Sequence, residues 1–161
     1  MSIKSFTSCT YNTSIWQLLE SFKNSWIIPE FQRGYVWTDD QVSRLIQSIA
    51  LGLPVASIIV CPVETSVSTG PYGNNYLIDG LQRCSAIDKF VNQGFNLTNV
   101  CIPELAGKTI KDIDFHLHFL QVGVTCVNKK MTEKEAKDFF ILINESTTKM
   151  DEQHLESIKH K

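Results

Sequence analysis

The chain has 161 residues, of which 43% are hydrophobic and 20% are charged. This length and composition predict one globular domain and exclude a largely disordered chain. The formal net charge of −2 excludes the strongly basic surface typical of domains that wrap DNA, but it is compatible with a local basic groove.

The sequence indicates neither a membrane span nor a disulfide framework. It contains no run of 18 apolar residues, and its first residues lack the apolar segment of a signal peptide. The cysteines are odd in number and form no CxxC pair, so we expect all of them to be free thiols that pack as small buried hydrophobic side chains. They are Cys9, Cys61, Cys84, Cys101 and Cys126. These features predict a cytoplasmic protein with no membrane partner and no zinc, haem or iron–sulfur group.

Four segments have the apolar spacing of amphipathic helices. We expect helices over about residues 15–22, 42–49, 83–92 and 136–143. A hydroxyl residue followed three positions later by glutamine or glutamate is typical of a helix start. Three of the four segments begin with such a pair: Ser14 with Gln17, Thr38 with Gln41, and Thr132 with Glu135.

Strand patterns lie between the predicted helices. Residues 56–63 and 76–79 predict a hairpin with a long polar loop over residues 64–75, and residues 122–127 predict a further strand. A short edge strand is expected over residues 26–28, where Pro29 ends it. Because helices and strands do not alternate regularly, we expect an α+β fold with a small mixed sheet and flanking helices.

The segment Tyr76–Arg83 places an Asp-Gly pair between a strand and a helix. Such a junction presents free backbone N–H groups and the positive end of a helix dipole, which favours a bound anion. Gly80 allows a sharp turn and close approach of a ligand. Arg83 in the first helical turn is unfavourable for the dipole unless an anion binds beside it. Two interpretations stay open, namely an anion site, or a helix capped by Asp79 with Arg83 paired to a surface carboxylate.

The segment Ile28–Trp37 alternates aromatic and polar residues. Arg33 carries a planar guanidinium that can donate two parallel hydrogen bonds to a phosphate or a carboxylate. Phe31, Tyr35 and Trp37 can stack on a base. The alternative interpretation is that these aromatic side chains bury the segment against the helix that follows.

Several motifs occur in a fixed order along the chain. They are Ile28-Pro29-x-Phe31-Gln32-Arg33-x-Tyr35-x-Trp37, Leu45-Ile46-x-Ser48-Ile49, Gly52-x-Pro54, Ile78-Asp79-Gly80-x-Gln82-Arg83 and Phe139-Phe140-x-x-Ile143-Asn144. This order resembles the DUF262 family, the N-terminal domain of GmrSD-type modification-dependent restriction enzymes, which belongs to the wider ParB/sulfiredoxin-like fold. The resemblance spans about residues 26–144. It implies one domain over residues 1–148, followed by a polar tail over 149–161 that can begin a helical continuation.

The resemblance implies a pocket for nucleotide phosphates. It assigns Asp79, Gln82 and Arg83 to catalysis, where Asp79 orients water or holds Mg²⁺ and Gln82 positions the attacking water. It assigns phosphate or nucleotide binding to Gly80, Arg33, Gln32, Phe31, Tyr35 and Asn144. Leu81 departs from the Asp-Gly-Gln-Gln-Arg motif of the family and removes one polar side chain from the implied site.

The function that the resemblance implies is nucleotide binding, with nucleotide hydrolysis as the reaction, in DNA restriction or phage–host conflict. The implied partners are a nucleotide, DNA, and a separate nuclease subunit or other protein. Two alternatives stay open. One is a non-catalytic module that recognises modified DNA or inhibits a defence system, and the other is a nuclease that acts directly on DNA. His116 and His118 form an HxH pair without a third ligand, so no metal site is predicted there.

Overall fold

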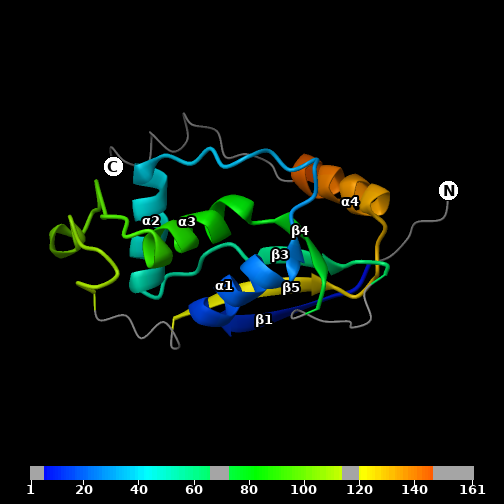
Figure 1. The fold of residues 1–161 in the computed structure, drawn as a ribbon, viewed down its shortest axis with the longest axis horizontal. Coiled ribbons are helices and arrows are strands. Elements are labelled where there is room, and N and C mark those ends of the chain that lie inside the picture. Colours follow the sequence, from blue (N-terminus) through cyan, green and yellow to red (C-terminus); the bar gives the residue numbers. More distant parts are fainter. Residues whose placement is uncertain (1–5, 66–72, 114–119, 147–161) are drawn as a thin grey trace.

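The computed structural model describes residues 6–65, 73–113 and 120–146, and it forms one five-stranded mixed sheet with helices on both faces (Figure 1). The strand order is β1-β5-β3-β4-β2. The strands are β1 (Ser8–Ser14), β2 (Trp26–Ile27), β3 (Ile58–Pro62), β4 (Asn75–Asp79) and β5 (Gln121–Val127). The helices are α1 (Ile15–Asn24), α2 (Asp39–Ala50), α3 (Leu81–Asn92) and α4 (Glu133–Ser146), with a short 3₁₀ turn at Pro103–Leu105. The predicted α+β class is confirmed.

All four predicted helices are present, and three of them begin at the predicted capping pairs. The Ser14 hydroxyl accepts from the Gln17 backbone N–H, and the Thr38–Gln41 pair makes both reciprocal bonds of a capping box. The Thr132 side chain likewise accepts from the Glu135 N–H, 3.2 Å away. The third helix begins at Leu81, two residues earlier than predicted, because the backbone turns at Gly80 with φ +110°.

The predicted hairpin and edge strand are also present, but the sequence analysis missed one strand. β3 pairs with β4 in antiparallel orientation, and β2 forms one edge of the sheet. The missed strand is β1, which forms the other edge and pairs with β5 along its whole length. Its sequence, SCTYNTS, lacks apolar alternation because most of its side chains face solvent.

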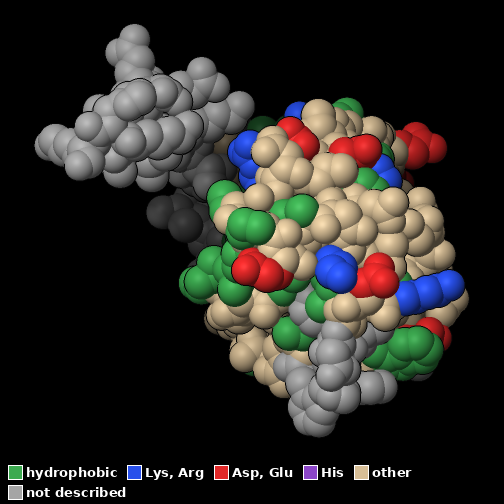
Figure 2. Space-filling view, turned by 90° about the vertical axis from the view of Figure 1, so that its left-hand side faces the viewer, with side chains coloured by type: hydrophobic (Ala, Val, Ile, Leu, Met, Phe, Trp, Pro, Cys, Tyr) green, Lys and Arg blue, Asp and Glu red, His purple; other side chains and the backbone are tan. Residues whose placement is uncertain are grey.

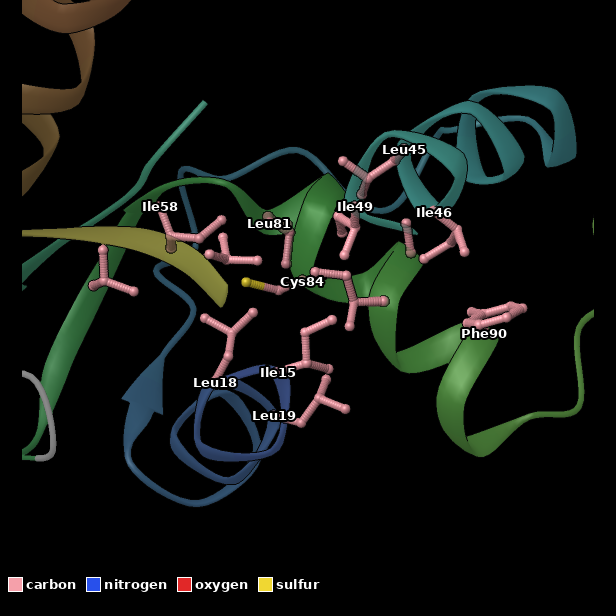
Figure 3. Close-up of a cluster of buried hydrophobic side chains, with 14 of the residues drawn as sticks. Ile15, Leu18, Leu19, Leu45, Ile46, Ile49, Ile58, Leu81, Cys84 and Phe90 are labelled. Carbon is pink, nitrogen blue, oxygen red and sulfur yellow. The ribbon is translucent and has the colours of Figure 1, made fainter. Parts of the chain in front are cut away.

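Two groups of buried side chains lie on opposite faces of the sheet. Alternate residues of β3 and β4 point to different groups, as the two-residue period of a strand requires. The larger group joins the sheet to α1, α2 and α3, and the smaller group packs beneath α4. Figure 3 shows α1 and α2 both directing apolar side chains at α3, with these residues labelled: Ile15, Leu18, Leu19, Leu45, Ile46, Ile49, Ile58, Leu81, Cys84 and Phe90. This packing fixes the position at which α3 begins.

Some sequence-based predictions lie outside the described residues. These are the His116–His118 pair, the centre of the loop over 64–75 and the tail over 149–161. Among the described residues, none of the helices combines the length and the apolar character needed to cross a bilayer. On the face shown in Figure 2, acidic and basic side chains are interspersed, so this face presents no extended surface of one charge.

All five cysteines are free, as predicted, but the prediction that all five are buried is wrong. Cys9 and Cys101 are exposed because one lies on the edge strand β1 and the other in the loop that follows α3. Cys61, Cys84 and Cys126 are buried. Burial raises the pKa of the Cys61 and Cys84 thiols to about 12 and also raises the pKa of Cys126.

The native protein is therefore expected to show two classes of thiol. Because the thiolate is the reactive form, an aromatic disulfide reagent at pH 8 is expected to titrate two thiols quickly and all five after unfolding in guanidinium. The variants Cys9→Ser and Cys101→Ser should each remove one equivalent from the fast phase. A fast phase of three or more thiols in the native protein would contradict the assignment.

Candidate functional site

A cleft of about 550 Å³ lies where the segment after β2, the turn between β4 and α3, and helix α4 meet. In Figure 1 the segment after β2 runs from the sheet past α4 and along α3 to the start of α2. Eight of the nine predicted site residues line this cleft. They are Phe31, Gln32 and Arg33 from that segment, Asp79, Gly80, Gln82 and Arg83 from the turn and α3, and Asn144 from α4. Residues more than 100 positions apart in the chain thus border one cleft.

The turn at Gly80 brings the start of α3 against strand β3. Gly80 is buried and has φ +110°, a backbone conformation that side-chain-bearing residues rarely adopt. A Cβ atom at this position would lie 2.5 Å from Cδ1 and 3.3 Å from Cα of Ile58. The sharp turn expected from the sequence is therefore observed, and the close approach that glycine permits is to the protein's own strand.

Helix α3 begins without a side-chain cap. Gly80 is the N-cap residue, and among the described residues no side chain caps the first turn of the helix. The alternative interpretation is therefore wrong in making Asp79 the cap, but its ion pair between Arg83 and a partly exposed carboxylate is observed, and that carboxylate is Asp79. The first N–H groups of a helix have no partner within the helix, and together they form the positive end of its dipole. This end of α3 borders the cleft through Leu81, Gln82 and Arg83.

The guanidinium of Arg83 is held from two sides. Its Nη2 donates to Oδ2 of Asp79 over 2.9 Å and to the carbonyl of Ser57 over 3.1 Å. The Arg83 side chain is only 17% exposed, whereas that of Asp79 is 44% exposed. The Nε of Arg83 is buried and has no hydrogen-bond partner among the described residues. A buried donor without a partner is costly, so this nitrogen is an unsatisfied donor beside the ion pair.

Gln82 fastens the segment before α2 to the start of α3. Its Oε1 accepts from the backbone N–H of Val36 over 2.9 Å and of Trp37 over 3.3 Å. Its Nε2 donates to the carbonyl of Gly34 over 3.0 Å. Both ends of the Gln82 amide are therefore engaged by the backbone, and positioning the segment is the role that these contacts support.

Gln32 makes a second attachment of the same kind. Its Nε2 donates to the carbonyls of Leu77 and Ile78, over 2.9 and 2.7 Å, at the end of β4. Arg33 follows directly, is exposed, and makes no hydrogen bond or ion pair within the described part of the chain. The two glutamines thus fix the backbone on either side of Arg33 and leave its guanidinium at the cleft without a partner.

The aromatic side chains of the same segment are not equivalent. Phe31 lines the cleft and packs against Phe140 of α4, with ring centroids 5.3 Å apart and planes at 43°. Trp37 also lines the cleft and packs partly buried against the larger core. Tyr35, which was expected in the same pocket, does not line the cleft and is 40% exposed. Burial raises the pKa of its hydroxyl, Lys89 opposes this shift, and Asp39 adds to it.

Some residues of the cleft were absent from the predicted site. Phe140 lies one helical turn before Asn144, so the four-residue spacing on α4 could have identified it. Leu81 was noted only as a departure from a motif, yet it lines the cleft. It also belongs to the larger core, so it lies between that core and the cleft. Ser57 acts through its backbone carbonyl, and no sequence pattern indicates such a contact.

Asp79 is the one carboxylate among the described residues that line the cleft. Across the described residues, no group of three or more histidine, cysteine, aspartate or glutamate side chains could hold a metal ion. Mg²⁺ is commonly bound by one or two carboxylates together with the phosphates of a substrate. The residues therefore fit a cation that arrives with a ligand and do not form a protein cage for one.

Residues 15–116 of the sequence match the family described as the GmrSD restriction endonuclease, N-terminal domain. The match covers more than half of the chain. The chain belongs to this family. The matched range includes both arginines of the cleft and both glutamine attachments, whereas Phe140 and Asn144 lie beyond it.

Comparisons with other proteins add little to the family match. No curated protein matches the chain. Among solved structures, the chain is similar to the C-terminally truncated chromosome-partitioning protein ParB from Caulobacter crescentus, crystallised with CTP-gamma-S, with a TM-score of 0.47 and 10% sequence identity. The alignment covers 88% of this chain and 56% of that chain. A similarity at this level carries no argument about function, and a ParB-like relationship stays a prediction.

Proposed function

We propose that this GmrSD-type N-terminal domain binds a nucleoside triphosphate in the cleft and acts in DNA restriction. The observation that carries the proposal is the convergence of Arg33, Arg83 and the uncapped start of α3 on one cleft. Guanidinium groups and helix N-termini are both favourable partners of phosphate oxygens. The family supports the restriction setting.

One part of the cleft lining is cationic and another part is aromatic. The guanidiniums and the free N–H groups of α3 suit the phosphates, where fixed positive groups stabilise charge at little reorganisation cost. Phe31, Phe140 and Trp37 offer ring faces against which a nucleobase can stack. Asn144 adds an amide on the same side of the cleft as Phe140, since both project from α4. A nucleotide is the ligand class that carries both phosphates for the cationic part and a base for the aromatic part.

Hydrolysis is a separate step of the proposal. When bound with the phosphates, Mg²⁺ would neutralise their charge, and Asp79 is the carboxylate available to hold it or to orient a water. Gln82 is assigned a positioning role, because its amide is bonded to the backbone of residues 34, 36 and 37. Leu81 replaces a glutamine of the family motif, so binding of nucleotide need not lead to its hydrolysis. Phosphate release must therefore be measured separately from binding.

Thermal denaturation with 1 mM ATP, GTP, CTP or UTP, each with and without Mg²⁺, tests the proposal. A ligand with a Kd of about 10 µM stabilises the folded state by about 2.7 kcal/mol at this concentration. For a domain of this size the melting temperature should rise by roughly 5–10 °C. Released inorganic phosphate then reports hydrolysis.

The alternative functions, a DNA-binding module and a direct nuclease, predict other experimental outcomes. If no nucleotide raises the melting temperature, and duplex DNA does so with a steep salt dependence, a DNA-binding module replaces the proposal. Nicking of plasmid DNA without added nucleotide would favour a direct nuclease.

A further inference from the structure

The cleft contains an acidic group that competes with any anion for one of its two arginines. Among the described residues, three charged side chains line the cleft, namely Arg33, Asp79 and Arg83, and their formal charges sum to +1. The carboxylate of Asp79 already accepts from Nη2 of Arg83 at 2.9 Å. Asp79 thus accepts from the same guanidinium that would donate to a phosphate oxygen.

The two partners of this ion pair differ in their freedom to move. Arg83 is largely buried, and the same Nη2 also donates to the carbonyl of Ser57, the residue just before β3, which holds the guanidinium in place. Asp79 lies at the end of β4 with its side chain nearly half exposed, and its Oδ1 makes no hydrogen bond or ion pair within the described part of the chain. The carboxylate is therefore the partner that can leave.

We propose that Asp79 is an internal competitor of ligand phosphate for Arg83 and thereby makes nucleotide binding depend on a divalent cation. This inference rests on the proposed function of the cleft. Without a cation, a triphosphate meets the negative charge of Asp79 and must displace it from Arg83. A cation held between Asp79 and the phosphates removes this repulsion and draws the carboxylate off the guanidinium. The partial exposure of the Asp79 side chain and the absence of a protein cage in the described residues both fit a cation shared with the ligand.

The competition has a consequence that distinguishes it from a simple metal ligand. If Asp79 only held the cation and did not oppose the phosphates in its absence, its neutral variant would bind nucleotide more weakly with Mg²⁺ and equally weakly without it. If Asp79 also competes for Arg83, the neutral variant binds more tightly than the wild type when no cation is present. The sign of the change in the absence of cation therefore decides between the two roles.

The experiment compares the wild type with Asp79→Asn by calorimetric titration of the NTP that binds best, in Mg²⁺ and in EDTA. In EDTA the variant should bind at least 10-fold more tightly than the wild type, and its ratio of affinities in Mg²⁺ and EDTA should fall close to 1. Asp39→Asn is the matched control, because Asp39 forms an exposed ion pair with Lys89 away from the cleft, with a 2.6 Å N–O distance. This control should keep the wild-type ratio.

Two outcomes overturn the inference, and they are distinguishable from each other. If the wild type binds nucleotide and Asp79→Asn binds it no more tightly in EDTA, Asp79 does not compete, while the proposed function stands. If neither protein binds any NTP in either buffer, the proposed function and the inference both fail. Asp79→Ser serves as a second neutral variant should Asp79→Asn not fold, and the melting temperature of each variant confirms its folding.

Discussion

Replacing Gly80 with alanine is expected to give the largest loss of stability of any single methyl addition in this domain. The variant places a Cβ atom at φ +110°, which costs about 1–2 kcal/mol for an L-residue in the left-handed region. It also introduces a methyl group 2.5 Å from Cδ1 and 3.3 Å from Cα of Ile58, and overpacking costs typically 1–3 kcal/mol. Ile58 is fully buried, so neither its side chain nor its backbone can move away freely.

The free energy of unfolding should fall by about 2–5 kcal/mol, which lowers the melting temperature by roughly 5–20 °C. Gly52→Ala is the matched control, because Gly52 also has positive φ (+66°) but a Cβ there would meet no atom within 4 Å. It should show the backbone cost alone, about 1 kcal/mol. A Gly80→Ala variant that melts within about 2 °C of the Gly52→Ala control would show that the turn relaxes without cost.

Replacing Arg33 with alanine is expected to weaken nucleotide binding by about 10- to 100-fold, since one charge-assisted hydrogen bond contributes about 1.5–3 kcal/mol. The chain has three arginines, and the third, Arg44, lies exposed on α2 outside the cleft. Arg44→Ala removes the same charge and should leave the affinity within about 2-fold of the wild type. Isothermal titration of the three proteins at one ionic strength makes the comparison.

Substitutions of the two cleft arginines should differ in their effect on the melting temperature of the protein without nucleotide. Arg33 has no bonding partner among the described residues, so Arg33→Ala should keep the wild-type melting temperature. Arg83→Gln removes the guanidinium from Asp79 and Ser57, so it should lower both the melting temperature and the affinity. Equal loss of affinity in Arg33→Ala and Arg44→Ala would show that net charge, and not the cleft, attracts the ligand.

Local sequence chemistry determined most of the secondary structure. The three capping pairs fixed the starts of α1, α2 and α4, because their hydrogen bonds join residues only three positions apart. Strand β1 was missed because an edge strand with polar side chains carries no apolar alternation. Its position depends on pairing with β5, more than 100 residues away in the chain.

The motifs of the sequence also indicated which side chains belong to the candidate site, but not what each one does. Arg33, Asp79 and Arg83 were predicted together, and the fold brings them to one cleft. Gln82 was expected to position water, yet its amide is bonded to a segment about 46 residues away, and Tyr35 does not line the cleft.

The sequence by itself determined the helix starts, the hairpin, the family and the residue types that surround the Asp-Gly turn, because these depend on near neighbours in the chain. Only the tertiary structure decided that Ser57 and two glutamines hold the site and that α4 forms one of its walls. Such contacts depend on the packing of α3 and α4 against opposite faces of the sheet. No local pattern encodes the distance between residues that the packed core brings together.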